Sequence, residues 1–97
     1  MMLAKIEEDI KRLARHTIVL NFVILHRSIG IIKLSELSGF PQHQVRYSLR
    51  VLEHHNLIKP SPQGAVATAR GKKFMQNLDK KIENLRKSLL DLSKLFY

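Results

Sequence analysis

Cysteine is absent from this 97-residue chain. Without thiols the chain forms no disulfide, and it has no thiolate that could bind a metal. Glycine occurs only four times, and the sequence has neither a glycine-rich phosphate loop nor an HExxH motif. No combination of nucleophile, base and acid is apparent either. We therefore expect a protein that is not an enzyme, with no catalytic residues, no metal and no cofactor.

Long hydrophobic runs are also missing. The longest, Ile18–Leu25, is interrupted by Asn21 and is far shorter than the ~20 residues that a membrane-spanning helix needs. The first fifteen residues alternate charged and aliphatic side chains, which is unlike a signal peptide. We expect a soluble, cytoplasmic protein that has no membrane partner.

Basic residues outnumber acidic ones by 17 to 8, so the formal net charge is +9. The excess is largest in residues 61–97, where eight basic and three acidic side chains leave a net +5. Such a charge attracts polyanions, either nucleic acid or an anionic membrane surface. Many basic surfaces are merely solvated, but the balance here favours a nucleic-acid partner.

Apolar residues recur at spacings of three and four along most of the chain, which is typical of amphipathic helices. Gly30 and Gly39 interrupt the pattern, Asn56 is a candidate left-handed C-terminal cap, and Thr68 is a good N-cap. A turn containing proline and glycine lies between two short apolar runs. The expected elements are helices over residues 3–27, 31–38, 41–55 and from 69 nearly to the chain end, with strands over 57–59 and 65–67.

The segment LSELSGFP, residues 34–41, is followed at helical spacing by apolar residues that end in a short strand. These residues are Val45, Leu49, Leu52, Leu57 and Ile58. The order resembles the winged helix-turn-helix core of MarR- and ArsR-type regulators over roughly residues 20–75, and Thr68-Ala69-Arg70-Gly71 resembles the threonine-x-x-glycine step after the second wing strand. The resemblance implies a mainly α (α+β) winged helix-turn-helix fold with a long N-terminal helix.

In that family the helix corresponding to residues 41–55 lies in the major groove of DNA, with the wing, residues 57–68, beside it. Because Val45, Leu49 and Leu52 face inward, the opposite side of the helix faces the groove. The expected groove-facing residues are Gln42, His43, Gln44, Arg46, Tyr47 and Arg50. The expected contacts to phosphate or the minor groove are Lys59, Gln63, Arg70, Lys72 and Lys73.

Side-chain chemistry suggests individual roles. Arg46 is able to bind guanine through two hydrogen bonds, and Gln42 or Gln44 adenine. Tyr47 is equally suited to packing on the protein's own surface. The family often has serine or threonine where Pro41 and Gln44 stand, and Pro41 offers no side-chain cap. The wing tip has no arginine, so we do not expect deep insertion into the minor groove.

The last helix carries an unbroken apolar seam, which is typical of a coiled coil over three heptads. Its residues are Met75, Leu78, Ile82, Leu85, Leu89, Leu92 and Phe96. The alternative is a helix that folds back on its own domain. Leu90 and Leu95 lie outside the seam and suggest a wider contact that includes the first half of the first helix. We expect a DNA-binding domain over residues 1–73 and a dimerisation helix over 74–97, making a homodimer.

Small archaeal chromatin proteins are similar in architecture, since they also join a basic winged helix to a C-terminal coiled-coil helix. The leading hypothesis is therefore a dimeric regulator of transcription that reads a two-fold symmetric site on double-stranded DNA. A nucleoid-associated chromatin protein of low sequence preference and a protein-docking winged helix are alternatives. The sequence identifies no small-molecule effector. The adjacent His54 and His55 point apart on a helix, so we expect no metal site among the five histidines.

Overall fold

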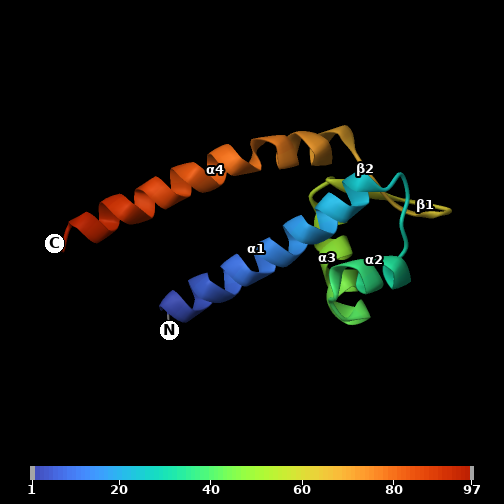
Figure 1. Cartoon of the computed structure of the whole chain (residues 1–97), viewed down its shortest axis with the longest axis horizontal. Helices are drawn as coiled ribbons and strands as arrows, with labels where there is room; N and C mark the ends of the chain where they lie inside the picture. Colours follow the sequence, from blue (N-terminus) through green and yellow to red (C-terminus); the bar gives the residue numbers. More distant parts are fainter. Residues whose placement is uncertain (1, 97) are drawn as a thin grey trace.

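A computed structural model of the chain describes residues 2–96 and contains four helices and one antiparallel pair of strands (Figure 1). The mainly α (α+β) fold class is therefore confirmed. The elements are α1 (Met2–Leu25), α2 (Ile31–Ser38), α3 (Gln42–His54), β1 (Ile58–Ser61), β2 (Gly64–Ala67) and α4 (Ala69–Lys94).

The order of the elements is as predicted, but several boundaries differ. Helix α1 ends at Leu25, so His26 and Arg27 lie beyond its last turn and not within it. Helix α3 begins at Gln42, because Pro41 has the extended ψ of 151° that is typical of an N-cap residue. The hairpin strands extend further toward the tip than residues 57–59 and 65–67, since Ser61 still pairs with Gly64.

A proline is tolerated in β1 because its partner strand β2 forms backbone hydrogen bonds with a third segment at the same position. Pro60 has no N–H to donate, and its partner in the register is Ala65. Ala65 instead exchanges both backbone hydrogen bonds with Ile29, at 2.8 and 3.2 Å. The connection between α1 and α2 is thereby attached to the outer side of β2, and the backbone groups of Ala65 have partners although Pro60 donates none.

The core lies where the second half of α1, helices α2 and α3, and the base of the hairpin meet. From α1 it takes Val19, Leu20 and Val23, while Ile18 and Leu25 stay exposed. The other buried hydrophobic residues are Ile29, Leu34, Val45, Leu52, Leu57 and Ile58. Only part of the apolar run of α1 is therefore buried, and helix α3 is held by the core along one side.

The start of α4 is fastened to the end of α3. Asn56 adopts the predicted left-handed conformation, with φ of 60°, and its carbonyl accepts a hydrogen bond from Thr68 Oγ1 at 2.8 Å. Thr68 is the predicted N-cap, and its hydroxyl accepts the Gly71 N–H at 3.0 Å. A side chain at Gly71 would overlap the Leu57 carbonyl, so glycine is needed for this close approach.

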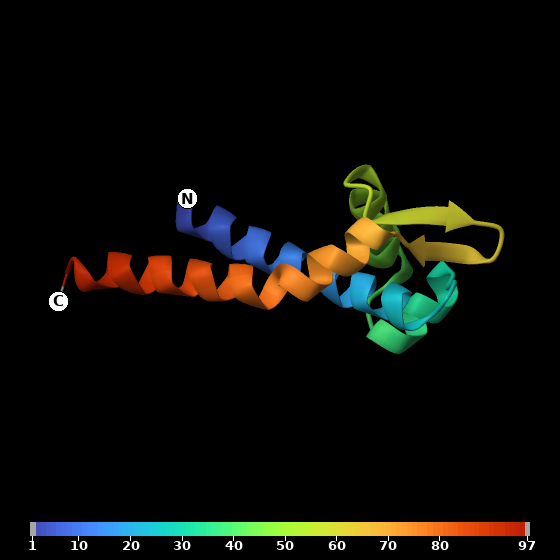
Figure 2. The same ribbon diagram turned by 90° about the horizontal axis from the view of Figure 1, so that it is seen from above.

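Helices α1 and α4 run in opposite directions, and both project from the body with the two chain ends at the same end of the molecule (Figures 1 and 2). The molecule is accordingly elongated, with principal extents of 54, 27 and 21 Å. Among the helices of residues 2–96, none combines the length and apolarity needed to cross a membrane.

Candidate nucleic-acid interface

Helix α3 has one buried side and one exposed side. Val45, Ser48 and Leu52 are buried, at the spacing of three and four that places them on one face. Among the predicted groove-facing residues, those on the far side are exposed: Gln42, His43, Arg46, Tyr47 and Arg50. Gln44 is half-buried, because its helical position is on the side of Ser48 and away from Arg46 and Arg50. The exposed side thus has two guanidinium groups one turn apart.

A glycine turn sets the angle between α2 and α3. Gly39 adopts the left-handed conformation with φ of 79°, and its N–H bonds the Ser35 carbonyl at 3.0 Å. The Ser35 hydroxyl donates to the Phe40 carbonyl at 2.7 Å, and Ser38 Oγ accepts the Phe40 N–H. These local bonds fix the conformation of the turn that leads into α3.

The beginning of α3 lacks a side-chain cap, as expected from Pro41. The Pro41 carbonyl accepts the N–H groups of Gln44 and Val45, at 3.0 and 3.1 Å. Gln42 and Arg46 border a hollow of about 580 Å³ whose other wall includes Lys33 and Glu36 of α2. Arg46 therefore lies at the α2 edge of the exposed side.

Tyr47 lies at the opposite edge, beside α1. Its ring centroid is 5.8 Å from that of His16, and the Arg15 guanidinium carbon lies 5.8 Å over the same ring. The tyrosine nevertheless remains 45% exposed. It thus packs on the protein's own surface while its outer edge stays open to solvent.

Sequence reasoning missed the polar contact beneath Tyr47. Ser48 is fully buried, and its Oγ accepts a hydrogen bond from Arg15 Nε at 3.1 Å and lies 2.8 Å from His16 Nδ1. The hydroxyl has one proton and two lone pairs, so the donor in the contact with His16 depends on the tautomer of the imidazole. Burial lowers the pKa of His16, and the charges of Arg15, Arg12 and His55 lower it further. This contact links α1 directly to α3.

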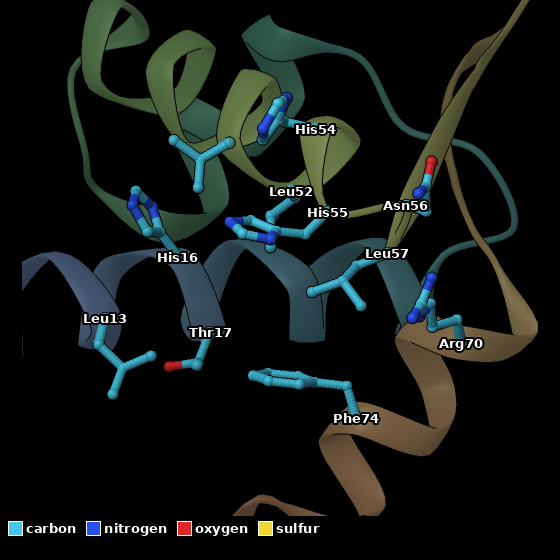
Figure 3. A pocket seen from close by; sticks show the side chains of 11 residues that line it. Leu13, His16, Thr17, Leu52, His54, His55, Asn56, Leu57, Arg70 and Phe74 are labelled. Carbon is cyan, nitrogen blue, oxygen red and sulfur yellow. The ribbon is translucent and has the colours of Figure 1, made fainter.

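The predicted phosphate contacts occupy three different places. Lys59 and Gln63 are exposed on the hairpin, whose tip is closed by a 2.6 Å bond from Ser61 Oγ to the Gly64 carbonyl. Arg70 borders a hollow of about 540 Å³ together with His54 and His55 at the end of α3 (Figure 3).

Lys72 and Lys73 are exposed in the first turns of α4. Lys72 lines a different hollow, with His26 and Arg27 beyond the end of α1. Arg70 and Lys72 are two positions apart, so they point to nearly opposite sides of α4. The structure brings Arg70 to the end of α3, but it does not bring Lys72 there.

The burial of the apolar seam of α4 decreases along the helix. Met75 and Leu78 are half-buried near the body, whereas Ile82, Leu85, Leu89, Leu92 and Phe96 are all exposed.

Within residues 2–96, no group of three or more histidine or acidic side chains is placed to hold a metal ion. No family model and no curated protein matches the sequence.

Proposed function

We propose that this chain is a winged helix protein that binds double-stranded DNA as a homodimer and regulates transcription. Helix α3 enters the major groove, and the hairpin, as the wing, lies beside it. The observation that carries the proposal is the exposed side of α3, with Gln42, His43, Arg46 and Arg50 on a helix braced by α1 and α2.

The dimensions of the helix suit a groove. The major groove of B-DNA is about 12 Å wide and admits one α-helix. Helix α3 has 13 residues, which is about 20 Å at 1.5 Å per residue. Arg46 and Arg50, one turn apart on the exposed side, are suited to guanine edges or phosphates, and Gln42 to adenine. Lys59 on the hairpin and Arg70 beside the end of α3 are suited to the flanking phosphates.

The proposed dimer explains why such a protein would read a symmetric site. Two copies joined through α4 present two α3 helices related by a two-fold axis, and a two-fold DNA site matches that symmetry. Within the cell, the protein would then be associated with the nucleoid.

A nucleoid protein of low sequence preference is the second candidate. It is favoured by the basic excess of residues 61–97, a net +5 that lies entirely outside α3. Both functions require DNA binding, and they differ in whether α3 reads bases.

Arg46→Ala and Lys59→Ala separate the two functions. Duplexes are selected from a random pool by the wild type and by each variant, and their affinities are measured over a range of salt concentrations. A regulator loses preference at one base position with Arg46→Ala, at a cost of about 1–3 kcal/mol. Lys59→Ala weakens binding to all sequences and lowers the salt slope by about one.

If both variants weaken binding uniformly, α3 reads no bases and the nucleoid candidate replaces the regulator. If the wild type binds no duplex at low salt, DNA binding is wrong altogether, and the exposed side of α3 is better explained as a surface that docks a protein.

A further inference from the structure

Two apolar stripes remain uncovered in the single chain. One follows the first half of α1, where the exposed fraction ranges from 39% at Leu13 to 65% at Leu3. The other follows the second half of α4, where it rises from 47% at Ile82 to 61% at Leu89. Ile6, Ile10, Leu85 and Leu92 continue these stripes. Contiguous apolar surface on this scale marks an interaction site in a folded protein.

The two stripes face each other. Leu13 and Thr17 of α1 and Phe74 of α4 point into the same space between the helices (Figure 3). Helical spacing places Ile6 and Ile10 on the side of Leu13, and Leu78 and Leu85 on the side of Phe74. The uncovered residues are therefore continuations of a contact that the chain itself makes near the body.

The stripes do not cover each other because the helices diverge. Helices α1 and α4 separate toward the chain ends (Figure 1), and α4 continues beyond the start of α1 (Figures 1 and 2). Together the two stripes are an uncovered apolar surface on the facing sides of two diverging helices, which we call the trough. Its residues are Leu3, Ile6, Ile10 and Leu13 of α1 with Leu78, Ile82, Leu85 and Leu89 of α4.

We propose that a second copy of this chain fills the trough. The α4 helix of each copy packs against the α1 stripe of the other, so that both α1 and α4 build a four-helix interface. The proposal deepens the homodimer of the proposed function, in which α4 alone is the seam, and it makes α1 an equal part of the interface.

The area favours a second copy. Leu3, Ile6, Ile10, Leu13, Ile82, Leu85 and Leu89 are each 39–65% exposed, and covering them contributes apolar area toward the ~800 Å² that each partner buries in a standard stable interface. Since the interface is two-fold, each chain supplies both the trough and the helix that fills it.

The width of the α4 stripe favours four helices over two. Leu90 and Leu95 are exposed at 47% and 74% and lie on either side of the main seam. A two-stranded coiled coil buries a narrow seam, whereas a helix inside a bundle needs a broader apolar face. Covering both flanks of α4 requires a neighbour in addition to the partner's α4, and the partner's α1 has a matching stripe.

Charges at the edges of the stripes are complementary. Glu7 flanks the stripe of α1 and Lys81 flanks that of α4, whereas Asp9 already pairs with Lys5 and Arg12 of its own helix and Arg86 with Glu83. In helical bundles such flanking residues pair between helices and set partner choice. Packing one copy's α1 against the other's α4 brings the opposite charges of Glu7 and Lys81 together.

The test is the association constant of the whole chain without DNA, measured by sedimentation equilibrium. Ile6→Lys places a charge in the α1 stripe, and Ala4→Lys adds the same charge to the outer side of the same helix. Leu85→Lys is the equivalent change in α4. We expect Ile6→Lys and Leu85→Lys each to weaken dimerisation tenfold or more, while Ala4→Lys leaves it unchanged.

All three positions lie outside the core, and circular dichroism verifies that each variant stays folded. A dimer that tolerates Ile6→Lys but not Leu85→Lys is a seam of α4 alone and overturns the proposal, as does a wild-type monomer at micromolar concentration. A wild-type dimer that associates through the trough but binds no DNA overturns the proposed function and leaves this interface intact.

Discussion

Replacing Ser48 by alanine tests how α3 is positioned. The hydroxyl is fully buried and is shared by two side chains of α1, Arg15 Nε at 3.1 Å and His16 Nδ1 at 2.8 Å. Alanine removes both hydrogen bonds and leaves the two polar groups against a methyl group. The cavity left by one oxygen atom is small, so the lost hydrogen bonds dominate the effect.

The expected loss follows from burial. A buried polar group without a partner costs about 1–3 kcal/mol. Arg15 and His16 are only half-buried, so water satisfies part of their demand and the lower half of that range applies. We expect the free energy of unfolding to fall by about 1–2 kcal/mol, and about 1 kcal/mol lowers the Tm of a domain this size by roughly 4–8 °C.

Urea denaturation at a fixed chain concentration measures this loss, because the stability of the proposed dimer would depend on concentration. Ser88→Ala is the matched control: its hydroxyl donates to the Asn84 carbonyl on the exposed surface of α4, so its effect stays within about 0.5 kcal/mol. In a double-mutant cycle with His16→Ala, the two losses are coupled by about 0.5 kcal/mol or more. Full stability of Ser48→Ala, or strictly additive losses, would refute the role assigned to Ser48.

Two further predictions concern the joints of the fold. Gly71→Ala is expected to destabilise the protein by about 1–3 kcal/mol in thermal unfolding, because the new Cβ overlaps the Leu57 carbonyl and α4 must move; Gly30→Ala, which has open space around it, is the control. Stability is also expected to fall as the pH drops below about 6.5, because the lowered pKa of His16 means that the unfolded chain binds a proton more readily than the folded one. His16→Gln removes the titrating imidazole and leaves an amide that is able to hydrogen-bond Ser48, so it should flatten that part of the pH profile, whereas an unchanged profile would assign the loss to other groups.

The order and type of the elements were predictable because local signals agree with the fold. Gly39, Asn56 and Thr68 have the conformations or caps that their residue types favour. The boundaries were harder where two signals compete. Proline is suited both to the first helical position and to the residue before it, and in this structure Pro41 is the residue before the helix. Pro60 looked like part of a turn, yet it fits a strand because Ala65 bonds to Ile29 instead.

The candidate site was predictable in the part that depends on helical periodicity alone. Spacing places Arg46 and Arg50 opposite Val45 and Leu52, and both arginines are exposed. The contacts between helices were not predictable in this way, because periodicity does not tell which neighbour faces a residue. The Arg15 and His16 contact with Ser48 is of this kind. Its one available signal was a serine that falls within the apolar stripe of α3.

The positions of the basic residues on α4 also depend on helix geometry. Arg70 and Lys72 are close in sequence, but a helix turns about 100° per residue, so only Arg70 reaches the end of α3. The exposed half of α1 shows a second limit of prediction from sequence. An apolar stripe predicts that a surface is covered, but it does not tell whether the same chain or another one covers it.

The most direct test of DNA binding through α3 compares two pairs of charge reversals. Arg46→Glu with Arg50→Glu alters the exposed side of α3, and Lys80→Glu with Lys87→Glu alters the outer side of α4 by the same total charge. Fluorescence anisotropy with a labelled duplex measures the affinity of each variant at constant salt. We expect the α3 pair to abolish binding and the α4 pair to retain most of it. Equal losses in both pairs would refute DNA binding through α3, because net charge alone would then explain the binding.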